Sequence, residues 1–185
     1  MRAAIDAGGR AFVLREKDLG REERRNLARA CLAVTSAAGA TLAIASDVGL
    51  AADLGGLPVH LAARDPRPRD ATWWGRSCHG EQELRAALEE GAAYATVSPV
   101  FSSTAKPGYG PALGEDGLRT LVHAAGELPV YALGGVTEER CAACMQAGAA
   151  GVAVMSAVMA ASDPAQAVAR LLERLEIAHP RRLPG

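Results

Sequence analysis

The sequence lacks an excess of charge of either sign, with 20 Lys and Arg residues against 21 Asp and Glu residues and a formal net charge of −1. Without a net basic field, non-specific binding to nucleic acid or to an anionic membrane surface is not expected. Long hydrophobic runs are also missing: the Ala-rich run 149–161 is interrupted by Gly and is shorter than the roughly 20 apolar residues of a membrane-spanning helix. Any anion site must therefore be local.

Cysteine is scarce, since four in 185 residues are too few for a disulfide scaffold. Cys141 and Cys144 form a Cys-x-x-Cys pair inside a segment of helical pattern, 137–147, with no second pair and no histidine nearby. We interpret this pair as part of a helix face rather than as a zinc or redox site. The first residues carry no secretory signal pattern, so we expect reduced thiols and a cytoplasmic protein.

Aromatic residues make up only 4% of the chain, whereas Ala, Gly and Val are abundant, which favours close packing of helices on a sheet. Apolar runs of about five residues alternate with longer segments of helical period, a pattern typical of parallel strands joined by helices. The length predicts one domain, 1–178, with a disordered tail, 179–185. The expected strands are Ala11–Leu14, Thr41–Ala45, Val59–Leu61, Trp74–Arg76, Ala93–Val97, Val130–Leu133 and Gly151–Val154.

The pattern predicts an α/β protein with seven parallel strands. In a (β/α) barrel another strand would precede the segment Arg2–Ala7, and we find no such strand in the sequence. An open doubly wound sheet is the alternative, because strand order cannot be read from the sequence. The expected helices are Arg2–Ala7, Glu22–Ala38, Glu81–Glu90, Glu115–Ala125, Thr137–Ala147 and Pro164–Glu176.

Polar residues and glycines follow the C-terminal ends of all seven expected strands, where parallel α/β folds build active sites, so we favour an enzyme. Arg15 and Lys17 follow the strand Ala11–Leu14 on alternate residues, so in extended backbone both cationic side chains point to the same side, which favours a phosphate-binding site. The alternative is a solvated strand end. Lys106 lies in the long, hydroxyl-rich loop 98–110, and such loops are commonly functional.

Asp47 and Asp65 follow two consecutive strands, and paired carboxylates facing phosphates are a usual seat for Mg²⁺. For Asp47, capping of the following helix is the alternative role. Gly134 and Gly135 after one strand, and Ser156 after the next, are typical of the phosphate cradle formed by the last loops of many barrels.

Seven motifs in order make the chain resemble the thiamine phosphate synthase and TenI-like superfamily, over roughly the span from Arg2 to Leu175. They are LREK (14–17), ASD (45–47), VHLAARD (59–65), GRSCH (75–79), SPVFSSTAK (98–106), ALGGV (132–136) and GVAVMS (151–156).

The resemblance implies a TIM (β/α) barrel, here without its first strand, and a synthase that joins hydroxymethylpyrimidine diphosphate to thiazole phosphate and releases pyrophosphate. These two small molecules are the expected partners and Mg²⁺ the expected cofactor. A homo-oligomer is a further expectation, because a missing first strand leaves the edges of its neighbours to be covered by another element or subunit. Residue by residue, it implies that Mg²⁺ is held by Asp47 and Asp65. It implies that pyrophosphate is bound by Arg15, Lys17 and Lys106 and accepts a hydrogen bond from Ser77, and that Ser46 lies on the pyrimidine diphosphate side. It also implies that the thiazole phosphate is held by Gly135 and Ser156, with Ser103 nearby.

The chain departs from the family pattern on the pyrimidine diphosphate side. Val13 and Ser46 stand where a Gln and an Asn are usual, and Ala105 replaces a hydroxyl residue. Two alternatives to the synthase follow. One is a TenI-like thiazole tautomerase, against which Pro99 argues because that activity is associated with a His there. The other is an inactive barrel that binds a thiazole or thiamine phosphate.

Overall fold

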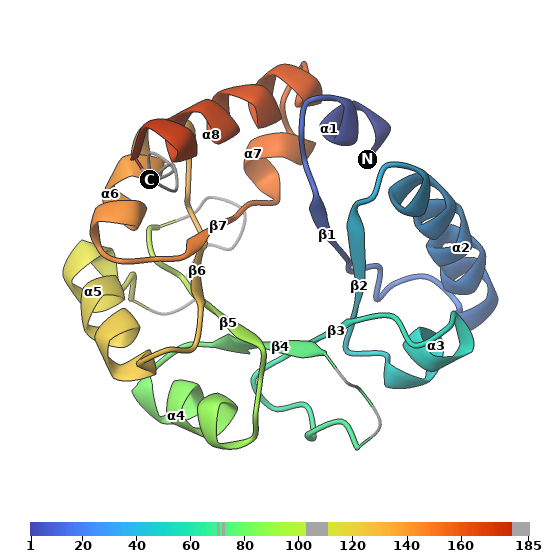
Figure 1. Ribbon diagram of the computed structural model, residues 1–185, viewed down its shortest axis with the longest axis horizontal. Helices are drawn as coiled ribbons and strands as arrows, with labels where there is room; N and C mark the ends of the chain where they lie inside the picture. Colours follow the sequence, from blue (N-terminus) through green and yellow to red (C-terminus); the bar gives the residue numbers. More distant parts are fainter. Residues whose placement is uncertain (70, 72, 103–110, 179–185) are drawn as a thin grey trace, which may run out of the picture.

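The computed structural model describes residues 1–69, 71, 73–102 and 111–178. Its strands are arranged in a ring, and the helices lie outside this ring (Figure 1). The strands are β1 (Ala11–Leu14), β2 (Thr41–Ala45), β3 (Val59–Leu61), β4 (Trp74–Cys78), β5 (Tyr94–Val97), β6 (Val130–Leu133) and β7 (Gly151–Ala153). The helices are α1 (Arg2–Asp6), α2 (Arg21–Ala37), α3 (Val48–Asp53), α4 (Glu81–Glu89), α5 (Gly114–Ala125), α6 (Cys141–Gln146), α7 (Ser156–Met159) and α8 (Pro164–Ala178), with one 3-10 turn, η1 (Glu138–Arg140). The predicted tail, 179–185, lies outside the described residues, and the single domain 1–178 stays a prediction.

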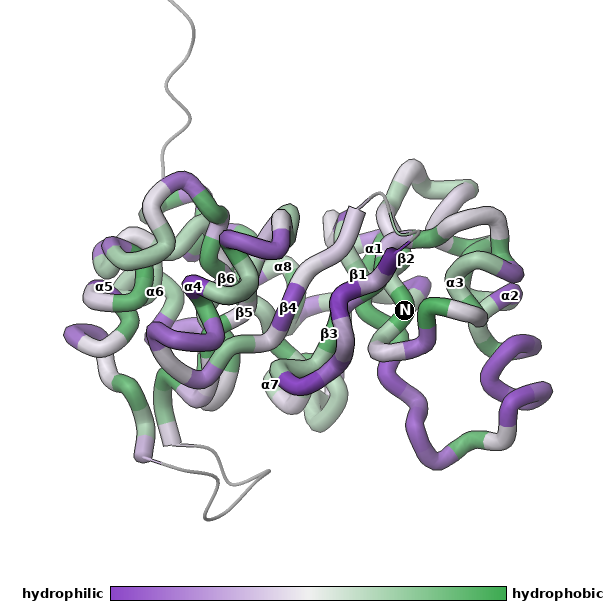
Figure 2. Tube along the Cα trace, turned by 90° about the horizontal axis from the view of Figure 1, so that it is seen from below, coloured by the Kyte–Doolittle hydropathy of each residue, from purple (hydrophilic) through white to green (hydrophobic). Residues whose placement is uncertain are grey.

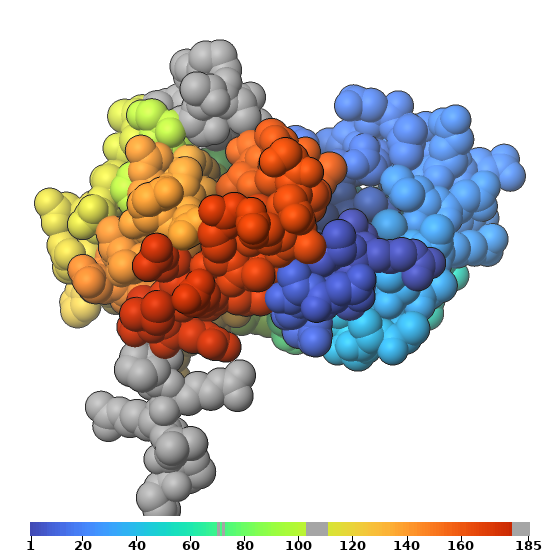
Figure 3. All heavy atoms as spheres, turned by 90° about the horizontal axis from the view of Figure 1, so that it is seen from above, coloured from blue at the N-terminus to red at the C-terminus, as the bar shows by residue number. Residues whose placement is uncertain are grey.

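The seven strands form one parallel sheet in which each strand pairs with the next along the chain, from β1 to β7. This order has no reversal, so the barrel prediction is confirmed and the doubly wound alternative is wrong. Within the described residues β1 and β7 are edge strands that do not pair with each other. Figures 1 and 3 show α1 and α8 side by side in the outer layer at this point, and a Cβ added to Gly8 would lie 2.9 Å from Leu172.

The predicted and observed elements agree closely, and the differences concern the ends of elements and short helices. The predicted helix 137–147 divides into η1 and α6, and α7 was not predicted because its four residues are too few to show a helical period. On β1, Phe12 and Leu14 pack under the helices, whereas Val13 points to the opposite face and is 47% exposed. Strand alternation explains this difference.

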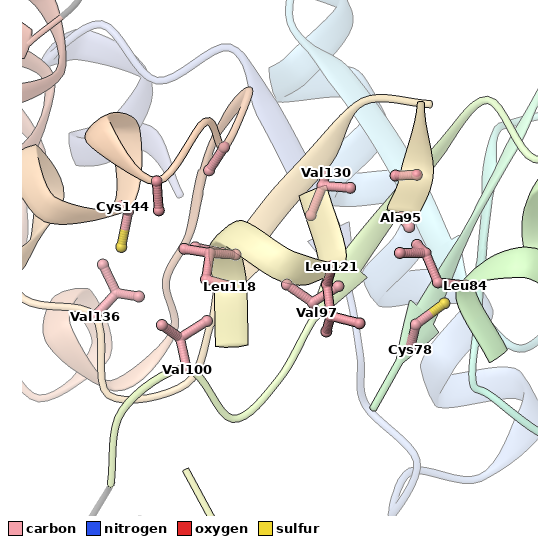
Figure 4. Packing of buried hydrophobic residues seen from close by; sticks show 14 of the residues in the cluster. Cys78, Leu84, Ala95, Val97, Val100, Leu118, Leu121, Val130, Val136 and Cys144 are labelled. Atoms are coloured by element: carbon pink, nitrogen blue, oxygen red, sulfur yellow. The ribbon is translucent and has the colours of Figure 1, made fainter. Parts of the chain in front are cut away.

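The core lies between the strands and the helices in two clusters, one over β1–β3 and one over β4–β7. Figure 4 shows the second, in which Val97 and Val130 of the sheet face Leu118 and Leu121 of α5. Cys144 also lies there, and burial raises the pKa of its thiol to about 11. Cys141 and Cys144 are both buried in this cluster, in agreement with the helix-face interpretation. In the described part of the chain, no helix is long and apolar enough to cross a membrane.

Candidate functional site

The predicted site residues that the structure describes lie at one end of the strand ring. Because all seven strands are parallel, their C-terminal ends face the same side. Figure 2 shows the loop between β1 and α2 extending from the ring as a largely hydrophilic run. The described candidates are Arg15 and Lys17 after β1, Ser46 and Asp47 after β2, Asp65 after β3, Ser77 in β4, Gly135 after β6, and Ser156 at the start of α7. Ser103 and Lys106 lie outside the described residues.

Asp47 has a structural role as the N-cap of α3. Its Oδ1 accepts the Leu50 backbone N–H at 2.9 Å, and its Oδ2 lies 3.1 Å from Nη1 of Arg24. A side-chain cap contributes about 1 kcal/mol to stability. The capping alternative is therefore confirmed, while the carboxylate stays 31% exposed. Its metal role stays a prediction.

Arg24 of α2 links two parts of the candidate site. Besides Asp47, it contacts the loop after β1, where its Nη2 donates to the backbone oxygens of Lys17 at 3.3 Å and Leu19 at 3.0 Å. The loop that carries the exposed cations Arg15 and Lys17 is thereby tied to the acidic end of β2. The sequence analysis missed Arg24, because its contact with Asp47 spans 23 positions along the chain.

Ser46 has the left-handed backbone conformation, with φ of +59°, and among the described residues it is the one non-glycine residue with a positive φ. Its N–H donates to the His60 carbonyl at 3.0 Å, which holds β2 against β3. Left-handed conformations are unfavourable for most residues, but Asn tolerates them better than Ser. The Asn usual in the resembling family fits this backbone requirement.

We expect Ser46→Asn to stabilise the fold by about 0.5 kcal/mol, because Asn lowers the cost of a left-handed backbone that amounts to about 1–3 kcal/mol. Urea unfolding followed by circular dichroism measures the change. Ser36→Asn, on the exposed face of α2, is the matched control and should bring no gain. Equal effects of the two substitutions would show that backbone conformation is not the cause.

The loop that carries Asp65 is held by hydrogen bonds from Arg76 of β4. Nη1 of Arg76 donates to three backbone oxygens of this loop, those of Asp65 at 2.8 Å, Ala63 at 3.2 Å and Ala62 at 3.4 Å. Nη2 lies 2.7 Å from Oε2 of Glu90, and the Arg76 side chain is only 5% exposed. Asp65 also accepts the Ala62 N–H through Oδ2 at 2.7 Å. The position of the Asp65 carboxylate is therefore fixed by a buried guanidinium that the sequence analysis missed.

Ser77 belongs to a hydrogen-bonded chain across β3, β4 and β5. Nε2 of His60 lies 2.9 Å from Oγ of Ser77, Nδ1 of His60 lies 2.9 Å from the Tyr94 hydroxyl, and Thr96 donates to Ser77 at 3.5 Å. Burial lowers the pKa of His60 to about 4 and raises the pKa of Tyr94 to about 12. At neutral pH the imidazole is thus uncharged and the phenol protonated. The sequence analysis assigned no functional role to His60.

Gly135 has a packing role in the described structure. Its φ is +64°, and an added Cβ would lie 2.6 Å from the backbone oxygens of both Phe101 and Ser102. Only a residue without Cβ lets the loop after β5 approach the end of β6 this closely. Ser156 is exposed at the start of α7. Phosphate binding by Gly135 and Ser156 stays a prediction, since close packing alone explains the glycine.

The chemistry of Asp47 and Asp65 fits a magnesium ion. Both carboxylates are partly exposed and follow neighbouring strands, β2 and β3. In the described ranges, no group of three or more His, Cys, Asp or Glu side chains is placed to hold a metal. Mg²⁺ does not need one, because it commonly binds one or two carboxylates and completes its shell with water and substrate phosphates.

Comparison with known proteins shows which family the chain belongs to. Residues 1–158 match the family model described as thiamine monophosphate synthase. A thiamine-phosphate synthase of Roseiflexus castenholzii is 36% identical over 181 residues, covering 92% of this chain and 78% of the relative. One of Moorella thermoacetica is 36% identical over 182 residues, covering 94% and 85%. The solved thiamine phosphate pyrophosphorylase of Pyrococcus furiosus superimposes with a TM-score of 0.86 at 26% identity, covering 96% of this chain and 88% of that one. The chain belongs to the thiamine monophosphate synthase family.

Proposed function

We propose that this protein joins hydroxymethylpyrimidine diphosphate to thiazole phosphate, forming thiamine phosphate and pyrophosphate. One observation carries the proposal: the chain is 36% identical to thiamine-phosphate synthases over more than nine-tenths of its length. The carboxylates and cations at the strand ends, Asp47, Asp65, Arg15 and Lys17, supply the charges that this chemistry needs.

In the proposed reaction, the bond between the pyrimidine methylene carbon and the diphosphate oxygen breaks, and the diphosphate leaves with the electron pair. The thiazole nitrogen then forms the new bond to that carbon. Negative charge develops on the leaving oxygen, so groups that are already oriented towards it lower the barrier. We assign this task to Arg15, Lys17 and Lys106, with the Ser77 hydroxyl as a hydrogen-bond donor.

Asp47 and Asp65 would hold Mg²⁺, which when bound supplies positive charge next to the diphosphate. Arg24 holds one oxygen of Asp47 and fixes the loop of Arg15 and Lys17. Ser46 is assigned to the pyrimidine diphosphate side, and Gly135, Ser156 and Ser103 to the thiazole phosphate. The two substrates thus meet over the C-terminal ends of the strands.

We expect purified protein to form thiamine phosphate from the two substrates in the presence of Mg²⁺. Product is measured by chromatography, with omission of each substrate in turn as controls. Chelation of Mg²⁺ should lower the rate by at least about 100-fold, as expected when a major electrostatic contribution is removed. A folded protein that forms no product with saturating Mg²⁺ contradicts the proposal. Turnover of a thiazole phosphate alone would instead indicate the tautomerase, and ligand binding without turnover the inactive barrel.

Two further expectations accompany the proposed function. A cytoplasmic location agrees with substrates that are phosphorylated metabolites. Homo-oligomerisation stays a prediction for analytical ultracentrifugation.

A further inference from the structure

The side chains of His60, Tyr94 and Ser77 form one hydrogen-bonded unit across three neighbouring strands. In the sheet register His60 of β3 is opposite Gly75 of β4, and Gly75 is opposite Tyr94 of β5. A Cβ on Gly75 would lie 2.2 Å from two atoms of the Tyr94 ring. The glycine therefore leaves room for Tyr94 to reach across β4, where its hydroxyl comes within 2.9 Å of Nδ1 of His60.

The protons in this unit can be assigned by counting donors and acceptors. A neutral imidazole has one N–H and one bare nitrogen, and a phenol has one proton to donate. Within the described residues, the hydrogen-bond partner of the Tyr94 hydroxyl is Nδ1 of His60. Each tautomer leaves one hydroxyl proton in the unit without an acceptor: that of Tyr94 if Nδ1 carries the imidazole proton, and that of Ser77 if Nε2 carries it. The open donor costs more at Tyr94, where desolvation by burial raises the pKa to about 12, than at Ser77, which lies at the C-terminal end of β4 where the proposed anion binds. Nδ1 is therefore the acceptor, and the imidazole proton lies on Nε2.

This assignment determines what Ser77 can do. The Nε2–H of His60 donates to Oγ of Ser77 at 2.9 Å, and the Thr96 hydroxyl donates to the same oxygen at 3.5 Å. With both lone pairs of Ser77 engaged as acceptors, its own hydroxyl proton has no acceptor in this unit. That proton is available to an anion at the end of β4. With the opposite tautomer, Ser77 would instead donate to His60.

We propose that Tyr94 and His60 are positioning residues that fix the imidazole tautomer and thereby make Ser77 a hydrogen-bond donor to the diphosphate of the substrate. The inference rests on the proposed function for the identity of the anion. Neither Tyr94 nor His60 is assigned a contact with substrate, and no proton is transferred between the residues of the unit during turnover. Its consequence is an energetic coupling between Tyr94 and Ser77 that is expressed in anion binding.

The first experiment tests the tautomer in the full-length protein without substrate. Long-range ¹H–¹⁵N NMR of histidine-labelled protein at pH 7, with His60 assigned from the spectrum of His60→Gln, should show the Nε2–H form. Tyr94→Phe keeps the ring but removes the hydroxyl donor, so we expect both tautomers. Tyr131→Phe is the matched control, because Tyr131 meets the Tyr94 ring edge-on at 5.7 Å and its hydroxyl is not part of the unit. A wild-type spectrum of the Nδ1–H form overturns the proposal.

The second experiment measures binding of inorganic pyrophosphate with Mg²⁺ by calorimetry. Ser77→Ala should raise Kd about tenfold, the loss expected for a hydrogen bond to a charged group. Tyr94→Phe should raise Kd about fivefold, which corresponds to a fall of the Nε2–H form to about one fifth of the population. The double variant should bind no more weakly than Ser77→Ala alone, because the effect of Tyr94 passes through Ser77. Tyr131→Phe should stay within about twofold of wild type.

The outcomes separate this inference from the proposed function. Additive losses in the double variant, or unchanged binding in Ser77→Ala, overturn the inference even when the protein forms thiamine phosphate. The Nε2–H tautomer together with a non-additive double variant supports it even when no thiamine phosphate forms, in which case the proposed reaction alone is wrong. Failure of the wild type to bind pyrophosphate overturns both.

Discussion

Asp65→Asn is expected to lower kcat/KM for thiamine phosphate formation by about 10²–10³-fold, or ~3–4 kcal/mol of transition-state stabilisation. The substitution removes the negative charge of the carboxylate that we propose binds Mg²⁺. It keeps an oxygen that can accept the Ala62 N–H, a bond that Oδ2 of Asp65 makes at 2.7 Å. The loop should therefore keep its shape while metal binding fails.

Steady-state rates measured over a range of Mg²⁺ concentrations test this expectation. The Mg²⁺ concentration for half-maximal rate should rise in Asp65→Asn, and the urea midpoint should change little. Asp53→Asn is the matched control, because Asp53 lies on the surface in an ion pair with Arg25 and such pairs contribute about 0–1 kcal/mol. Its activity should equal that of wild type. Unchanged Mg²⁺ dependence in Asp65→Asn would show that Asp65 does not hold the metal.

Most of the strands could be predicted from the sequence because they are short, mainly apolar runs bounded by polar residues or glycine. β1, β2, β3 and β6 have the predicted ends. β4 begins at the predicted Trp74, but its C-terminal end was not predicted, since the strand continues through the polar Ser77 to Cys78. Local polarity favours a loop there, but pairing with β5 keeps the backbone extended.

The C-terminal location of the site was also predictable, since it follows from parallel strands and from where polar residues stand. The contacts that hold the site residues were not. Arg24 reaches Asp47 across 23 positions, and Arg76 reaches Glu90 across 14. In the sequence these arginines look like any other charged residue, because only the fold determines which of them are buried and paired.

His60 is an intermediate case. In the segment from Val59 to Leu61, the histidine stands between two apolar residues that are both 1% exposed. Strand alternation places it on the opposite face, inside the ring, which the sequence could have indicated. Its partners Ser77 and Tyr94 could not be inferred in this way, since they depend on the register of β3 and β5 with β4.

Arg76→Met is expected to destabilise the fold by about 3 kcal/mol, the lower end of the cost of removing one partner from a buried ion pair. Methionine fills a similar volume but leaves three backbone oxygens of the loop 62–65 without their donor. Glu90, the ion-pair partner, is 38% exposed and can be hydrated. Most of the loss should therefore come from the loop rather than from the ion pair.

Two companion variants separate these contributions in urea unfolding. Glu90→Gln keeps an acceptor for Arg76 but leaves a guanidinium that is 5% exposed without its counter-charge, so it should cost about 1–2 kcal/mol, less than Arg76→Met. Arg76→Lys keeps the charge, but an ammonium cannot reproduce the planar set of donors that spans the loop and Glu90, so its cost should be intermediate. Because the same loop carries Asp65, both Arg76 variants should also raise the Mg²⁺ requirement of any remaining activity. If Glu90→Gln costs as much as Arg76→Met, the contribution of Arg76 to stability comes from its ion pair with Glu90 and not from its contacts with the loop.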